Sequence, residues 1–87
     1  MGRSARALVV VDLQVDFGDP QGSLFVDGAP VALPRILRLV ERARTHGDLV
    51  VWSQDWHPES TPHFADQGGA WPRHCVAGSR GAELLPE

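Results

Sequence analysis

The pattern of hydrophobic and polar positions changes several times along the chain. Residues 5–11 form an apolar run with three consecutive valines, closed by Asp12. A short β-branched run without alternation is typical of a strand buried on both faces, as in a parallel sheet. Residues 49–52 repeat this pattern with the sequence LVVW. We therefore expect two buried strands in these segments.

Between these runs, the spacing predicts a helix over residues 29–46. Apolar side chains recur with helical period on one side, at Leu33, Ile36, Leu37, Val40 and Ala43. Pro34 is tolerated only near the first turn, and Gly47 stands where a left-handed residue commonly ends a helix. Strand, helix and strand in this order predict a βαβ unit with two parallel strands.

The other segments have no such period. Residues 15–30 are rich in Gly, Pro and Asp, so we expect a loop without regular structure. After Ser53 no helix or strand is predicted up to residue 87, yet Trp56, Phe64 and Trp71 argue against disorder. A loop of that length in a compact domain is usually functional. In open α/β sheets, ligands bind beyond the carboxyl ends of the strands, where Asp12 and Asp55 lie.

Composition narrows the class of protein. A chain of 87 residues makes at most one small domain or a part of one, and we assign residues 1–87 to a single such unit. The net charge of −3 argues against nucleic-acid binding, which needs a basic face. No apolar run suits a membrane span or a signal peptide, and the single cysteine fits a reducing compartment. We expect a cytoplasmic protein with neither a nucleic-acid nor a membrane partner.

Candidate metal ligands gather in the long final segment, which holds three of the four histidines. In extended chain, residues two apart point the same way, so Asp55 and His57 can approach one ion together. His63 and His74 follow in turn-rich chain that can fold back. One carboxylate and three imidazoles suit zinc, iron(II) or manganese better than magnesium or calcium. The spacing alone leaves a second interpretation open, in which these are ordinary surface histidines.

The motifs in chain order are DLQVDF from Asp12, GSL from Gly22, SQDWHP from Ser53 and WPRHCVAGSRGAEL from Trp71. With these motifs the chain resembles the N-terminal half of the nicotinamidases, within the isochorismatase-like cysteine hydrolases. The resemblance implies an α/β fold, here a partial three-layer α/β/α parallel sheet. It also implies hydrolysis of nicotinamide to nicotinate and ammonia, a step of NAD salvage.

The resemblance assigns roles to particular residues. It implies that Asp12 is the general base of a triad with a Cys nucleophile and a Lys. It implies a divalent metal ion, zinc, iron or manganese, that binds the pyridine nitrogen of the substrate. Phe17 and Trp71 would flank the pyridine ring. The metal ligands would be Asp55, His57, His63 and His74.

The chain departs from the family in one respect. The family's Lys and nucleophilic Cys follow the matched region, and this sequence contains no lysine. Cys75 precedes VAGSRG and not a helix, so we expect an inert thiol. We therefore expect the N-terminal part of a nicotinamidase-like hydrolase, apparently truncated and without activity of its own. The alternatives are a non-catalytic metal-binding fragment or subunit, and a related hydrolase acting on another amide or on isochorismate.

Two strands and one helix leave apolar sheet surface and a strand edge open. We therefore expect the chain to be marginally stable by itself, and to depend on a homo-oligomer or on a missing C-terminal half.

Overall fold

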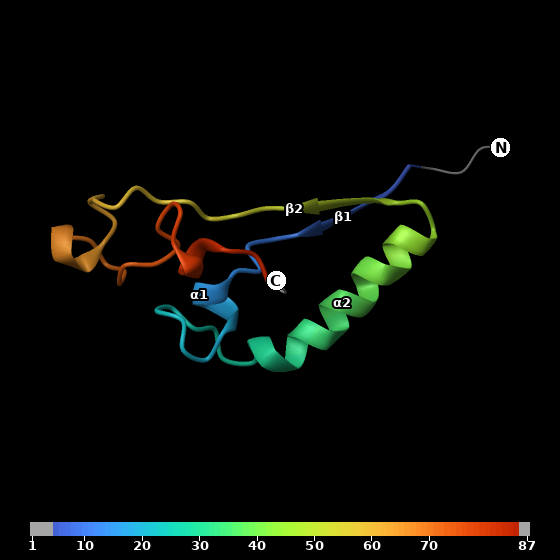
Figure 1. The fold of residues 1–87 in the computed structure, drawn as a ribbon, viewed down its shortest axis with the longest axis horizontal. Helices are drawn as coiled ribbons and strands as arrows, with labels where there is room; N and C mark the ends of the chain where they lie inside the picture. The colour runs from blue at the N-terminus through green and yellow to red at the C-terminus, as the bar shows by residue number, and fades with distance from the viewer. Residues whose placement is uncertain (1–4, 86–87) are drawn as a thin grey trace.

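The computed structural model describes residues 5–85, and its strands and long helix all precede residue 53. Strand β1 (Ala7–Val10) pairs in parallel with β2 (Leu49–Trp52), and helix α2 (Ala29–Thr45) connects them. Figure 1 shows α2 slanting across one side of this two-stranded sheet. The predicted βαβ unit and the parallel α/β class are confirmed.

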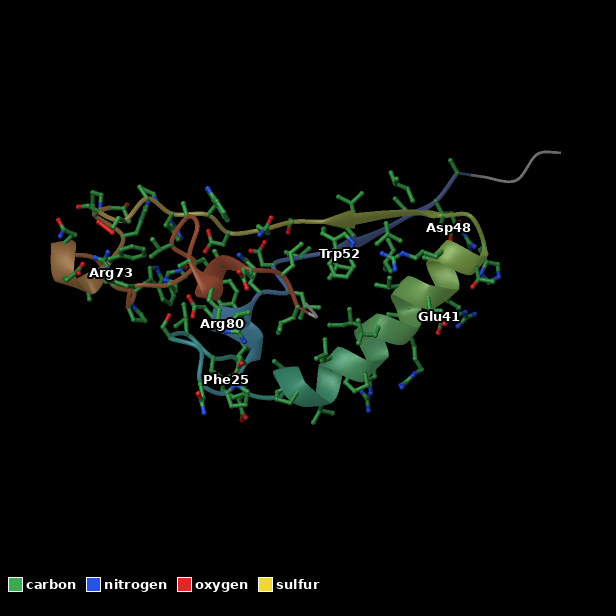
Figure 2. All side chains as sticks on the ribbon, viewed as in Figure 1. Phe25, Glu41, Asp48, Trp52, Arg73 and Arg80 are labelled. Atoms are coloured by element: carbon green, nitrogen blue, oxygen red, sulfur yellow. The ribbon has the colours of Figure 1, made fainter. Side chains whose placement is uncertain are left out.

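The core lies between the sheet and α2. Val10, Leu13 and Val40 are its buried members, and further apolar side chains pack partly buried around them: Leu8, Leu33, Ile36, Val50, Trp52 and Leu85. Trp52 projects from β2 toward the helix side of the sheet (Figure 2). The helical stripe predicted from the sequence is therefore the surface that packs on the sheet.

The prediction that both strands are buried on both faces is wrong for the described residues. β1 is also shorter than the predicted run of residues 5–11. Val9 and Leu49 are 55% and 64% exposed, because no described element covers the face opposite α2. The valine-rich sequences are typical of strands in the interior of a sheet. In the described residues, only the face toward α2 is covered.

The segment 15–30 is not wholly irregular, which corrects the prediction of a loop there. Val15–Gly18 form the single helical turn α1. The side-chain amide of Gln14, the residue before this turn, forms hydrogen bonds with the backbone of Asp55 and Ala82. The backbone carbonyl of Gln14 accepts from the Phe17 and Gly18 N–H groups, at 3.1 and 2.8 Å. Four residues are too few for a periodic pattern, so the sequence carried no helical signal.

Helix α2 begins and ends close to the predicted positions. Pro30 lies in its first turn, while Pro34 lies inside the helix, where its ring removes one backbone donor. His46 caps the C-terminal end, and Gly47 follows with φ 75°, the left-handed conformation expected there. Within residues 5–85, no helix is both long and apolar enough to cross a membrane.

The remaining chain, from Ser53 to residue 85, contains two 3₁₀ turns, η1 (Ala65–Gln67) and η2 (Arg80–Ala82), and no helix or strand among the described residues. It extends away from α2, so that Arg73 and Asp48 lie at opposite ends of the molecule (Figure 2). The radius of gyration is 15.5 Å, whereas a compact domain of this length has about 12 Å. The fold is therefore elongated, with the βαβ unit at one end and the long loop at the other.

Truncation of the core should lower stability measurably. Val40→Ala removes two buried methyl groups and should reduce the free energy of unfolding by about 2 kcal/mol. Val31→Ala on the same helix is the control, since Val31 is 66% exposed. It should change stability by less than about 0.5 kcal/mol. Urea titrations followed by circular dichroism measure both, and equal effects would contradict the assigned core.

Candidate metal centre

Asp55 and His57 meet just beyond the carboxyl end of β2. Their side chains are half-buried, and His57 Nε2 lies 3.0 Å from Asp55 Oδ2. Trp56 between them is 57% exposed, because neighbouring residues in extended chain point to opposite sides. The prediction that Asp55 and His57 point to one place is confirmed.

His74 reaches the same carboxylate from the far end of the loop. Its Nε2 lies 3.3 Å from Asp55 Oδ2, and its side chain is buried. The backbone brings it there, because His57 N–H donates to the Cys75 carbonyl at 2.9 Å and Ala77 N–H donates to the His57 carbonyl at 2.8 Å. These two bonds form a short parallel bridge between the two ends of the loop.

The donor set fits a divalent ion. His74 Nδ1 lies 2.7 Å from the Pro72 carbonyl, which can only accept, so Nδ1 carries the hydrogen. His74 Nε2 then points at a carboxylate oxygen 3.3 Å away, a contact that either a proton on Nε2 or a metal cation between the two atoms would stabilise. Ligands at about 2.1 Å from an ion lie about 3.0 Å apart in octahedral and about 3.4 Å apart in tetrahedral geometry. The observed separations of 3.0 and 3.3 Å fall in this range.

His63 does not join this group. Asp55, His57 and His74 have ligand atoms within 4.8 Å of one another, and His63 is absent from that set. Its exposed ring lies beside His57, with ring centroids 6.0 Å apart. It does line the same pocket, so the structure unites three of the predicted ligands and places the fourth at the rim.

The pocket over these residues has a volume of about 350 Å³. Phe17 and Trp71, the predicted ring-binding residues, both line it, together with Leu24. The Phe17 ring also packs against His74, with centroids 5.7 Å apart. A cavity of this size, with apolar walls and a few polar groups, suits a small molecule.

The Phe64 ring packs against the rings of both His57 and His74. It is fully buried, and its ring centroid lies 5.4 Å from that of His57 and 5.6 Å from that of His74. The Arg73 guanidinium sits 5.5 Å from the same ring and donates to Asp66 and to the Glu59 carbonyl. The sequence analysis assigned Phe64 no role. Its position directly after His63 was the available signal.

Asp12 lies at the end of β1, outside the pocket. Its backbone is left-handed, with φ 54°, and its N–H donates to the Ser53 carbonyl at 3.2 Å. The Ser53 hydroxyl donates to Asp12 Oδ1 at 2.8 Å and lies 3.0 Å from the Asp12 nitrogen. Phe17 lines both the cavity that contains Asp12 and the pocket that contains the candidate metal ligands. The role of Ser53 was not predicted from the sequence, although Ser53 directly follows β2, the strand paired with β1.

Cys75 is fully buried and close to carboxylates. Burial, and secondarily the negative charges of Asp55, Asp16 and Asp12, raise the pKa of the thiol to about 12. A thiol with this pKa stays protonated at neutral pH, so it is a poor nucleophile. The structure therefore agrees with the expectation of an inert cysteine.

Residues 6–87 match the model of the isochorismatase domain. The chain belongs to the isochorismatase domain family. Among curated relatives, it is 37% identical to the nicotinamidase of Escherichia coli K12, over 93% of this chain and 45% of that protein. The chain thus spans about half the length of the curated relatives it matches.

Solved structures give the same result. The pyrazinamidase of Pyrococcus horikoshii, crystallised with zinc, superimposes with a TM-score of 0.90 at 39% identity, covering 97% of this chain and 46% of that one. A protein from L. infantum crystallised with nicotinate gives 0.83 at 41% identity, covering 94% and 40%. The fold class inferred from the sequence is therefore that of its relatives.

The burial of Cys75 is directly testable. We expect iodoacetamide at pH 8 to leave the folded protein unmodified for as long as it stays folded, because the thiol is both protonated and enclosed. In urea the same thiol should react at the rate of a free cysteine. Mass spectrometry measures both, and rapid modification of folded protein would contradict the buried position.

Proposed function

We propose that this chain carries the metal-binding and proton-accepting part of an amidohydrolase that converts nicotinamide to nicotinate and ammonia. In this proposal residues 1–87 form the N-terminal part of one isochorismatase-like hydrolase domain. The main support is the meeting of Asp55, His57 and His74 in a pocket whose other walls include Phe17 and Trp71. The relatives named above add the substrate class.

Asp55, His57 and His74 would hold a divalent ion, with His63 at the rim as a further ligand. Once bound, the ion would supply a Lewis-acidic site for the pyridine nitrogen and so orient the substrate. Nitrogen and carboxylate donors suit zinc, iron(II) and manganese. We favour zinc because the similar P. horikoshii protein was crystallised with it.

The chain's own side chains would position the substrate. Phe17 and Trp71 offer ring faces on the pocket wall, where a flat aromatic ligand gains stacking contacts. Phe17 also borders the space in front of Asp12. A ring held beside Phe17 would therefore direct its amide toward that carboxylate.

Asp12 would act as the general base. Ser53 orients the carboxylate by donating to Oδ1, and within residues 5–85 no hydrogen bond to Oδ2 is found. Oδ2 would therefore accept the proton of a thiol nucleophile. Cys75 does not serve as that nucleophile because it is buried and protonated, so the thiol must come from elsewhere in the fold. The single cysteine also fits a reducing compartment, and we place the reaction in the cytoplasm.

The buried thiol also favours a second candidate function. Without an accessible nucleophile, the 87-residue chain would bind the metal and the pyridine ring but hydrolyse nothing. The two candidates share the metal and ring sites, and for both the chain alone should release no ammonia. They differ in whether a domain that contains this chain and a reactive thiol hydrolyses nicotinamide.

Metal binding by this chain tests the proposed site directly. We expect one equivalent of zinc to bind, and His57→Ala to lower the affinity at least about tenfold because a ligand is lost. His46→Ala is the matched control, since His46 lies at the end of α2, away from the pocket. Equilibrium dialysis with elemental analysis measures both. Equal affinity of the two variants would rule out the proposed site.

Binding of nicotinamide tests the proposed ring site. Nicotinamide should bind to the zinc-loaded chain, release heat in a calorimeter and yield no ammonia. Trp71→Ala should weaken this binding while leaving zinc stoichiometry unchanged, because Trp71 lines the pocket without being a ligand. Ammonia released by the chain alone would overturn the conclusion about Cys75. Zinc binding without nicotinamide binding would contradict the pyridine site that both candidates assume, and would leave only the metal site.

A further inference from the structure

Residues 59–71 fold back on themselves and carry His63 at the rim of the pocket, so we call them the rim loop. Trp71 N–H donates to the His63 carbonyl at 3.2 Å, and Ala65 N–H donates to the Trp71 carbonyl at 2.6 Å. A Cβ on Gly69 would clash with the His63 carbonyl, so glycine permits this close approach. The candidate ligand His63 and the pocket-wall residue Trp71 therefore belong to one backbone unit.

Arg73, directly before His74, binds the rim loop at two points. One terminal nitrogen of its guanidinium donates to the Asp66 carboxylate at 2.9 Å, and the other donates to the Glu59 carbonyl at 2.6 Å. These acceptors lie on either side of His63 in the sequence. The guanidinium is a planar fork of donors, so one side chain can hold both partners in fixed directions. Figure 2 shows Arg73 at the end of the molecule away from α2.

The same guanidinium also packs on the Phe64 ring, at 5.5 Å from its centroid. That ring is fully buried and meets both His57 and His74 in T-shaped geometry. The side chains of Arg73 and Asp66 are 42% and 48% exposed, and an exposed ion pair alone contributes little to stability. Here the ion pair acts together with a backbone hydrogen bond and a cation–π contact, which joins the rim loop to two candidate metal ligands through one ring.

We propose that Arg73 is a positioning residue that holds the rim loop against the other candidate metal ligands, and thereby places His63 and Trp71 at the pocket. The proposal rests on the metal site proposed above and deepens it. Arg73 does not line the pocket, so it would act through the rim loop and Phe64. Without its contacts, His63 would have to be ordered when the ion binds, and that ordering costs conformational entropy.

The contacts of Arg73 are testable without metal. In the metal-free chain, Arg73→Ala should speed hydrogen exchange of the Ala65 and Trp71 amides at least about tenfold, because the rim loop opens more often. Arg38→Ala is the control, since it removes the same charge from an exposed position on α2 and should leave these rates unchanged. Exchange followed by NMR resolves single amides. Equal rates in the two variants would overturn the proposal.

The amides of β2 are the internal reference in this experiment, because β2 lies outside the rim loop. Their exchange should be the same in Arg73→Ala as in the unaltered chain. An equal rise in β2 would show that Arg73 stabilises the whole fold, and would contradict a local role at the pocket.

Zinc affinity distinguishes positioning of His63 from general stabilisation. Arg73→Ala should weaken zinc binding at least about fivefold in the otherwise unaltered chain, and less than about twofold in the His63→Ala background. The second loss is smaller because the ligand that Arg73 positions is already absent. Equilibrium dialysis of the four chains completes this double-mutant cycle. Losses that add independently would show that Arg73 does not act through His63.

The metal site and the role of Arg73 can fail separately. No zinc binding by the unaltered chain, or equal affinities of His57→Ala and His46→Ala, would refute the metal site, and the exchange rates would still decide whether Arg73 holds the rim loop. Zinc binding by the unaltered chain, with exchange unchanged in Arg73→Ala, would refute the role of Arg73 alone.

Discussion

The side-chain amide of Gln14 is the contact on which the site depends. Gln14 is fully buried, and its Oε1 accepts from the Asp55 N–H at 2.8 Å while its Nε2 donates to the Asp55 carbonyl at 2.9 Å. The second hydrogen of Nε2 is donated to the Ala82 carbonyl at 2.8 Å. One amide therefore holds both backbone groups of Asp55, a candidate metal ligand, and ties this residue to η2. A glutamate has no donors and a leucine has neither donors nor acceptors, so neither would replace it.

Asp16, two residues after Gln14, completes this polar framework. Its Oδ2 accepts from the Cys75 N–H at 2.8 Å, and its Oδ1 accepts from the Ser23 N–H at 3.2 Å. The first bond holds Cys75 in a left-handed conformation, with φ 48°, directly after His74. A Cβ on Gly81 would clash with the Asp16 carboxylate that holds Cys75, so glycine permits this close approach. Helix α1 thus serves mainly to present Gln14 and Asp16 to the loop.

The sequence predicted those parts of the fold and of the candidate metal site that depend on local chain geometry. The βαβ unit follows from local periodicity, which is why α2 and both strands were found near their positions. Asp55 and His57 are two residues apart in extended chain, so local geometry also predicts their meeting. The approach of His74 depends on the hydrogen bond that the neighbouring Cys75 N–H donates to Asp16 and on the bridge between His57 and Val76. Both link distant segments and leave no periodic signal in the sequence. Residue type alone made His63 and His74 candidate ligands, and the motif resemblance supported both. The structure brings His74 to Asp55 and leaves His63 at the rim.

The two ends of the molecule are stabilised by different forces. The loop end is held by directional hydrogen bonds around Gln14 and Asp16, and fully buries Phe64 and Cys75. The βαβ end has a small apolar core and leaves one sheet face open. Hydrogen bonds fix angles and distances, which a metal site needs, whereas apolar contact is non-directional and grows with the area buried. The ligand geometry can therefore form within this chain, while the sheet gains stability only when more apolar surface covers it.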